Sequence, residues 1–123
     1  MKASRVVVAQ DRGHVVGTLT LQKKKPWSID VSFFTPCKRP LYLINMAVRP
    51  DRQRTGVGKL LLAEALTMAR SLPADAIRLD AYDAPAGAGE FYRKCGYRQV
   101  GGRTFRGTPL VYFERGIRGD VPA

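Results

Sequence analysis

Apolar and polar residues follow periods along the chain that predict strands interrupted by two helices. Residues 5–10 and 14–21 are rich in valine and threonine, and the turn-forming run Asp11-Arg12-Gly13 lies between them. They predict a β-hairpin. Residues 23–26, three lysines and a proline, predict a solvated loop. Residues 28–34 are a candidate for a further extended segment, after which Pro36 and Pro40 break regular structure.

The middle of the chain carries the clearest periodic signals. Residues 41–48 form a nearly continuous apolar run of strand length, which predicts a strand covered on both faces at the centre of a sheet. From Val57 onward apolar residues recur at helical spacing until Pro73 ends the pattern. Residues 76–82 predict the next strand, residues 90–94 a short helix that Gly96 closes, and residues 97–104 and 109–114 two final strands.

This order of elements predicts an α/β fold. A mixed central β-sheet flanked by helices would be built around a β-α-β unit at residues 41–82. A length of 123 residues fits one core, so we expect a single domain spanning residues 1–123.

Composition and charge indicate the cellular compartment and the kinds of ligand to expect for such a domain. The formal charge of +11 comes from 21 Lys and Arg against 10 Asp and Glu, which predicts a surface that attracts anions. No apolar run approaches the roughly 20 residues that span a bilayer, so we expect neither a membrane partner nor a secretory signal. Cys37 and Cys95 are the two cysteines, and they indicate neither a disulfide scaffold nor a zinc site. We therefore expect a cytoplasmic protein without a metal.

The run at residues 48–61, VRPDRQRTGVGKLL, couples the predicted central strand to the start of the predicted helix through a loop that contains Gly56 and Gly58. A helix N-terminus has unpaired amide groups and a partial positive charge, so it can bind a phosphate. The glycines remove side chains that would block its approach. Additional positive charge comes from Arg49, Arg52, Arg54 and Lys59.

Two other phosphate-binding loops do not fit this run. A P-loop needs glycine at position 53 and Ser or Thr at position 60, where the chain has Gln53 and Leu60. A dinucleotide-binding fingerprint needs glycine at position 61, where the chain has Leu61. The remaining alternative is a tight strand-to-helix connection with no ligand.

The run Gln53-Arg54-Thr55-Gly56-Val57-Gly58 resembles the acetyl-CoA signature Q/R-x-x-G-x-G/A of the GNAT superfamily of N-acetyltransferases. Residues 46–50 resemble the strand ending that precedes this signature, and residues 90–97 resemble the later FYxxxGF/Y segment. The resemblance implies the acyl-CoA N-acyltransferase (GNAT) fold and acetyl-CoA as the co-substrate. It also implies that an acetyl group is transferred directly to a primary amine in a ternary complex.

The resemblance further implies a role for particular residues. The main chain of Met46, Ala47 and Val48 would pair with the pantetheine arm of the coenzyme. Tyr92 would lie near the coenzyme sulfur, where a phenol with a pKa of about 10 can donate a proton or a hydrogen bond to the departing thiolate. The pyrophosphate would bind to the amides of Gln53, Arg54, Thr55, Gly56, Val57, Gly58 and Lys59.

The general base is less well determined by the sequence. We favour Asp83, because it would lie just past the end of the strand beside the coenzyme cleft. An exposed carboxylate that balances nearby arginines is the alternative for any one candidate. The further candidates are Asp80, Glu90 and, less directly, Asp30.

The chain also departs from the family pattern. Many members carry an asparagine seven residues before the tyrosine, where this chain has Pro85, so that contact with the coenzyme is absent or replaced. The usual fold begins with a strand and one or two helices that form much of the acceptor wall. This chain is expected to start near the second strand, which makes the fold short at its N-terminus.

Two other functions remain as alternatives. The basic character suggests a nucleic-acid-binding module, with Lys23, Arg103 and Arg106 among its cations. Since no zinc finger, RNP motif or helix-turn-helix accompanies them, we do not expect nucleic acid as a partner. A non-catalytic acyl-CoA-binding protein is the other alternative. For the enzyme, the expected partners are acetyl-CoA and an amine acceptor, either a small molecule or a protein, and a homodimer is compatible with these features.

Overall fold

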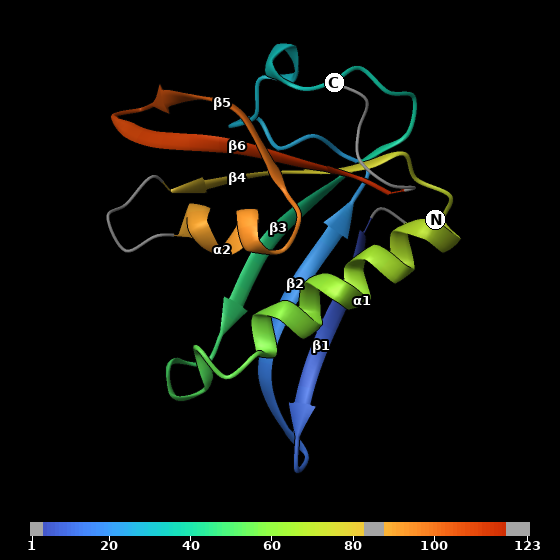
Figure 1. Cartoon of the computed structure of the whole chain (residues 1–123), viewed down its shortest axis with the longest axis vertical. Coiled ribbons are helices and arrows are strands. Elements are labelled where there is room, and N and C mark those ends of the chain that lie inside the picture. The colour runs from blue at the N-terminus through green and yellow to red at the C-terminus, as the bar shows by residue number, and fades with distance from the viewer. Residues whose placement is uncertain (1–3, 83–87, 118–123) are drawn as a thin grey trace.

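The computed structural model describes residues 4–82 and 88–117, which form one mixed β-sheet with two helices (Figure 1). The six strands lie in the order β1-β2-β3-β4-β6-β5. β3 and β4 are parallel, and the other neighbouring pairs are antiparallel. The predicted mixed sheet flanked by helices is confirmed. The elements are β1 (Ser4–Asp11), β2 (His14–Gln22), β3 (Pro40–Val48), α1 (Val57–Ser71), β4 (Ala76–Tyr82), α2 (Ala88–Lys94), β5 (Arg98–Phe105) and β6 (Thr108–Gly116).

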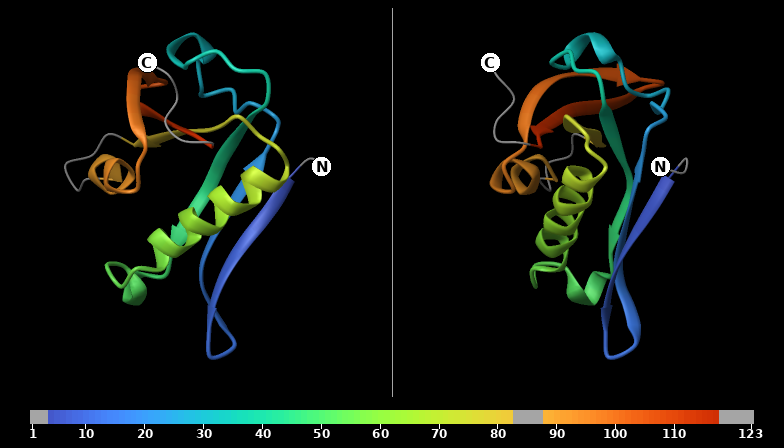
Figure 2. Two further views of the ribbon diagram at one scale, coloured as in Figure 1. Left: turned by 45° about the vertical axis from the view of Figure 1, so that its right-hand side comes forward. Right: turned by 90° about the vertical axis from the view of Figure 1, so that its right-hand side faces the viewer.

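Both helices cover the same face of the sheet, as the side view in Figure 2 shows. α1 forms the crossover between β3 and β4, and its apolar stripe of Leu61, Leu62, Ala65 and Ala69 is buried. Gly17 on β2 allows α1 to come close, because a Cβ there would lie 2.9 Å from the Leu61 side chain. The predicted β-α-β unit is therefore present, and it directs the N-terminus of α1 to the end of β3.

The expectation of an extended segment at residues 28–34 is wrong. The chain forms a short 3-10 helix at Val31–Phe33, and Asp30 caps it by accepting hydrogen bonds from the amide and the hydroxyl of Ser32. Ile29 and Phe34 are buried against the sheet instead of pairing with a strand. Their apolar side chains therefore reflect packing of a loop, which periodicity alone cannot distinguish from a strand.

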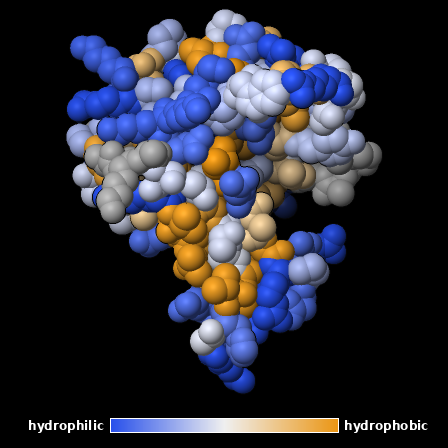
Figure 3. Space-filling model, turned by 180° about the vertical axis from the view of Figure 1, so that it is seen from behind, coloured by the Kyte–Doolittle hydropathy of each residue, from blue (hydrophilic) through white to orange (hydrophobic). Residues whose placement is uncertain are grey.

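The residues between β2 and β3 form a second, smaller core on the face of the sheet opposite the helices. Ile29 and Phe34 pack there with Tyr42 and Tyr112, and the rings of Phe34 and Tyr112 lie 5.3 Å apart. On the face opposite the helices, β1 is left uncovered. Its Val6 and Val8 alternate with the buried Val7 and are exposed to solvent. Figure 3 shows this rear side, with apolar side chains along its middle and hydrophilic side chains around them.

Two charged side chains are buried beside this second core. Arg78 and Glu114 are 3% and 2% exposed and lie opposite one another on β4 and β6. Arg78 donates to the Tyr42 hydroxyl at 3.0 Å and to the Thr35 carbonyl at 2.8 Å. Glu114 accepts from the Thr35 amide at 2.8 Å and lies 3.6 Å from Arg98. These contacts attach the β2–β3 connection to the sheet, while Arg78 Nε and Glu114 Oε2 are buried without a hydrogen-bond partner among the described residues.

Replacing Glu114 with alanine should lower the free energy of unfolding by about 2 kcal/mol, because the Thr35 amide is then left without its acceptor and Arg98 without its ion-pair partner. Urea denaturation measures this change. The control is Glu64→Ala on the exposed side of α1, which should change stability by less than about 0.5 kcal/mol. Equal losses in the two variants would contradict the role given to Glu114.

Candidate functional site

The site begins where β3 and β4 separate. These strands pair only over Pro40–Tyr42 and Ala76–Arg78, although both continue beyond those residues. Between Ile44 and Ala47, β3 has one residue more than the paired stretch Thr18–Thr20 of β2, so β3 forms a β-bulge. Asn45 in this bulge has a φ of 54°. A gap therefore opens between the two central strands.

This gap corrects the expectation that β3 is covered on both faces along its whole length. Leu41, Tyr42 and Leu43 are buried, as predicted, but from Ile44 onward every residue of β3 is partly or fully exposed. The β4-facing backbone groups of residues 46–48 have no strand partner within the described part of the chain. Unpaired amides and carbonyls at such a place can bind a ligand that carries amide groups of its own.

A pocket of about 1000 Å³ occupies the gap and extends to the start of α1 and to α2. The structure brings most of the sequence-predicted site residues together in its lining. Tyr82, Phe91 and Lys94 also line it and were not among the predictions. The predicted residues that line the pocket are Met46, Ala47, Val48, Gln53, Arg54, Gly56, Gly58, Lys59, Glu90 and Tyr92.

Two residues of the predicted turn, Thr55 and Val57, do not line the pocket. The hydroxyl of Thr55 donates to the carbonyl of Arg52 and so closes the turn from within. Val57 packs against the main core. Asp83 lies outside the described residues, as does Pro85.

Glycine is favoured at the two positions of the turn for different structural reasons. Gly56 is the N-cap of α1 and has a φ of 94°, a left-handed conformation that favours glycine. Gly58 sits where the helices meet, since a Cβ there would lie 3.0 Å from the Phe91 ring and 3.4 Å from Met46. Among the described residues no side chain caps the N-terminus of α1, which leaves its first amides, beside the pocket-lining Gly56 and Gly58, without an internal acceptor.

The positive charge at the turn is smaller than the sequence suggested. Arg49 forms an ion pair with Asp51, and Arg52 forms one with Asp11 on β1. These two arginines therefore support the turn rather than add free charge, which corrects the expectation that all four cations of the run face a phosphate. Arg54 and Lys59 remain in the pocket lining.

Tyr92 is the buried polar group of the pocket. Its side chain packs against the rings of Phe113 and Tyr97, and its hydroxyl lies 3.7 Å from the sulfur of Met46 on β3. Burial, and then the negative charge of Asp80, raise the pKa of Tyr92 to about 12. The phenol is therefore protonated at neutral pH and can donate one hydrogen bond into the gap.

The carboxylates proposed as bases lie in different surroundings. Asp80 on β4 is half-buried and accepts a hydrogen bond from the Ser28 hydroxyl at 2.7 Å. Hydrogen bonds from Ser32 hold the pKa of Asp30 below its usual value, which makes Asp30 a weaker base. Glu90 lines the pocket from α2, with Lys94 4.0 Å away on the same helix.

The pocket residues and contacts that the sequence analysis did not predict differ in how far the sequence indicates them. Phe91 and Lys94 flank Tyr92 on a predicted helix, so a helical projection of residues 90–94 could have placed them near the pocket. Ser28 lies 52 residues from Asp80 in the sequence, and no local pattern indicates their contact.

The described residues carry neither a metal-ligand cluster nor a membrane-spanning helix. Over residues 4–82 and 88–117, no group of three or more His, Cys, Asp and Glu side chains is arranged to hold a metal ion. Within the same ranges, no helix combines the length and the apolar character needed to cross a membrane.

The chain is similar to several known acetyltransferases. The sequence model of the acetyltransferase (GNAT) domain matches residues 2–99. Glucosamine 6-phosphate N-acetyltransferase of Schizosaccharomyces pombe is 31% identical over 98 residues, which cover 78% of this chain and 80% of that protein. The uncharacterized N-acetyltransferase YvbK of Bacillus subtilis is 27% identical over 84 residues, 68% of this chain, and the match spans only 46% of the relative.

The fold also matches a solved structure with a bound ligand. A GNAT family acetyltransferase from Elizabethkingia anophelis, crystallised with acetyl-CoA, superimposes with a TM-score of 0.72 at 18% identity. The match covers 91% of this chain and 75% of that one. Identity at this level shows a shared fold.

The raised pKa of Tyr92 makes stability depend on alkaline pH. Below about pH 10 the Tyr92 phenol is protonated in both the folded and the unfolded chain. Above pH 10 the phenol ionises first in the unfolded chain, because its pKa is 10.0 there and about 12 in the folded protein. The free energy of unfolding should therefore fall as pH rises from 10 through 12, by about 1 kcal/mol at pH 11 from this group. Urea denaturation at pH 9 and pH 11 should show this loss for the wild type relative to Tyr92→Phe. The same pH dependence in both proteins would contradict the burial of this phenol.

Proposed function

Because the chain belongs to the acetyltransferase (GNAT) family, we propose that it transfers an acetyl group from acetyl-CoA to a primary amine of a second substrate. The transfer would be direct, with enzyme, acetyl-CoA and acceptor in one ternary complex. The observation that carries this proposal is the pocket between β3 and β4. It joins unpaired strand backbone, an uncapped helix N-terminus and a buried phenol in a single cavity.

Each part of the coenzyme has a chemical counterpart in this pocket. The pantetheine arm carries amide groups that would pair with the β4-facing backbone of residues 46–48, where the Val48 carbonyl accepts a hydrogen bond from the Gln53 side chain at 3.2 Å. The pyrophosphate would bind to the amides of residues 53–59, where the α1 N-terminus contributes partial positive charge. Lys59 and Arg54 would add full charges beside it.

The acetyl group would then lie in the gap, next to Tyr92. The amine nitrogen attacks the thioester carbonyl carbon, the carbon–sulfur bond breaks, and the sulfur leaves with the electron pair as a thiolate. A thiol has a pKa of about 8.5, below the value of about 12 for Tyr92. Tyr92 therefore keeps its proton and stabilises the thiolate by a hydrogen bond rather than by full proton transfer.

The amine must lose a proton when it attacks. We propose Asp83 as the base that accepts this proton, directly or through a water molecule. This assignment rests on the place of Asp83 in the sequence, one residue after the pocket-lining Tyr82 at the end of β4. Proximity of the two substrates in one gap would supply much of the rate.

Binding of acetyl-CoA at the turn can be tested with a matched pair of glycine variants. Gly56→Val introduces a side chain at a φ of +94° in the proposed pyrophosphate site, and it should weaken binding of acetyl-CoA by about 10-fold or more. Gly13→Val introduces the same side chain at a φ of +80° in the β1–β2 turn, where a Cβ also meets open space. It should bind acetyl-CoA like the wild type. Titration calorimetry measures both affinities.

An equal loss of affinity in the two variants would show that backbone strain acts through stability and not at the site. Absence of acetyl-CoA binding by folded wild-type protein would refute the proposed function. Binding of an oligonucleotide in its place, with a steep dependence on salt, would support the nucleic-acid alternative.

Replacing Tyr92 with phenylalanine should lower the kcat for release of coenzyme A thiol, over a panel of amines, by about 100-fold. The KM for acetyl-CoA should stay within about two-fold, because the hydroxyl acts on the developing thiolate. Tyr97→Phe is the control, since Tyr97 is also buried and its hydroxyl has no hydrogen-bond partner among the described residues. Acetyl-CoA binding without thiol release in the wild type would indicate a non-catalytic acyl-CoA-binding protein.

A further inference from the structure

An exposed aromatic and cationic cluster lies at the tip of the β5–β6 hairpin, outside the pocket between β3 and β4. The tip cluster consists of Trp27, Arg103, Phe105 and Arg106, none of which lines that pocket. Trp27 is 69% exposed and meets the Phe105 ring edge to face at 5.5 Å. The Arg106 guanidinium lies over the Trp27 ring, 4.3 Å from its centre, and the Arg103 guanidinium lies 5.5 Å from the centre of the Phe105 ring. These contacts join the four side chains into one surface.

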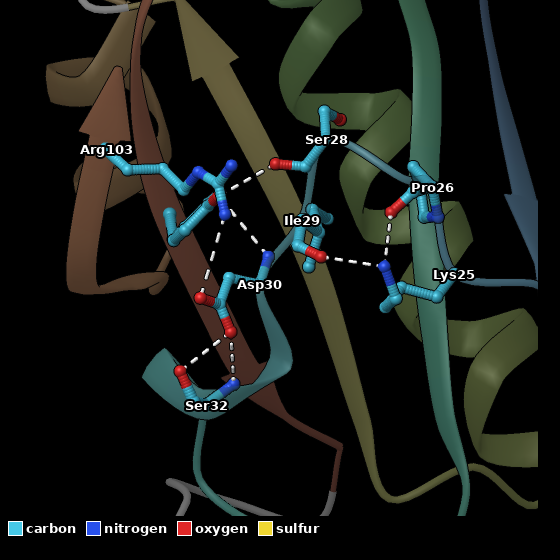
Figure 4. Close-up of polar contacts among 8 residues, drawn as sticks. Lys25, Pro26, Ser28, Ile29, Asp30, Ser32 and Arg103 are labelled. Carbon is cyan, nitrogen blue, oxygen red and sulfur yellow. Dashed lines mark hydrogen bonds and ion pairs between the residues drawn. The ribbon is translucent and has the colours of Figure 1, made fainter. Parts of the chain in front are cut away.

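A hydrogen-bonded loop presents the Trp27 ring to solvent. Trp27 is the second residue of a turn in which the Ile29 amide donates to the Pro26 carbonyl at 3.1 Å. Lys25 closes the same turn, because its ammonium group donates to the carbonyls of Pro26 and Ile29 at 3.1 and 2.8 Å. Figure 4 shows Lys25 directed to these two carbonyls. An exposed ring on a loop ordered in this way loses little further conformational freedom when a flat ligand stacks on it.

The positive charges of the tip cluster are only partly neutralised. Arg103 lies 3.7 Å from Asp30, and this ion pair also attaches the loop to β5. Among the described residues no carboxylate lies within 4.0 Å of the Arg106 guanidinium and no acceptor takes a hydrogen bond from it. The exposed lysines of residues 23–25 directly precede the loop. The surface therefore places positive charge beside an open indole ring, which fits an anion that also carries a flat aromatic group.

A single-stranded nucleic acid has both of these features. Its unpaired bases offer flat faces that stack on an exposed aromatic ring, and its phosphates match the planar fork of a guanidinium group. The hairpin turn restricts Arg106, since Arg106 and Gly107 have φ angles of 51° and 81° and directly join β5 to β6. A peptide of acidic residues would pair with the charges but would bring no planar group to the ring. The formal charge of +11 favours the same polyanionic partner.

We propose that the tip cluster binds single-stranded nucleic acid, with one base stacked on Trp27 and a neighbouring phosphate bound by Arg106. No linear motif marks this surface, because Trp27 and Arg106 lie far apart in the sequence. The expectation that nucleic acid is not a partner therefore did not take it into account. This binding goes beyond the proposed acetyl transfer and does not depend on it, since the tip cluster and the pocket between β3 and β4 share no residue.

The test measures binding of a labelled single-stranded oligonucleotide of about 10 nucleotides by fluorescence anisotropy. Trp27→Ala should weaken binding by about 10-fold, because the base loses its stacking partner. Trp27 is the single tryptophan of the chain, so its fluorescence in the wild type should be quenched by the unlabelled oligonucleotide. Inorganic polyphosphate of equal charge carries no bases, and it should bind more weakly and leave the fluorescence unchanged.

A matched pair of arginine variants tests the phosphate contact. Arg106→Asn should weaken oligonucleotide binding and lower the slope of log K against log salt concentration by about 1, because one phosphate contact is lost. Asparagine followed by glycine is favoured in such a turn, so the hairpin should keep its fold. Arg12 and Gly13 form the same kind of turn between β1 and β2, with φ angles of 53° and 80°. Arg12→Asn removes the same charge from the same local conformation and should bind the oligonucleotide like the wild type.

Equal effects of the Arg12 and Arg106 substitutions would overturn the proposal, because net charge alone would then explain the binding. Equally tight binding of polyphosphate or polyglutamate would overturn it in the same way, and so would binding of phosphatidylserine vesicles without oligonucleotide binding. Displacement of the oligonucleotide by acetyl-CoA would place it in the pocket between β3 and β4, against the proposal. Failure of folded protein to bind acetyl-CoA would refute the proposed function instead and would leave Arg106-dependent oligonucleotide binding as support for the tip cluster.

Discussion

The short pairing between β3 and β4 is the constraint on which the rest of the molecule depends. The two parallel strands share only three residue pairs before β3 bulges and the strands separate. The separation leaves backbone donors and acceptors without partners, which a folded protein tolerates only where water or a ligand replaces them. It also directs the end of β3 into the turn before α1 and lets Tyr92 reach the gap from α2.

The helices and strands could be predicted largely because local chemistry determines them. Val57 starts α1 where the glycine turn ends, and the hairpin at Arg12 and Gly13 follows from turn preference. The loop after β2 was less predictable: Ile29 and Phe34 are apolar, and sequence patterns do not show whether such residues belong to a strand or pack on one.

The pocket lining from β3 and the turn was predictable for the same local reason. The turn and the strand end are contiguous in the sequence, so their residues necessarily lie close together. Contacts between distant segments were not predictable: Arg52 pairs with Asp11 from 41 residues away, and Ser28 with Asp80 from 52. Only tertiary structure shows that one contact pairs a cation of the turn and that the other attaches the β2–β3 loop to β4.

The ion pair between Arg52 and Asp11 has a consequence for how the chain responds to ligands. It attaches the turn before α1 to the outermost hairpin of the sheet, whose own edge is open to solvent. A ligand that binds only the folded state raises the free energy needed to open any segment whose opening would release the ligand. A ligand that orders this turn would therefore also favour, through the Arg52–Asp11 ion pair, the closed state of the sheet edge at β1.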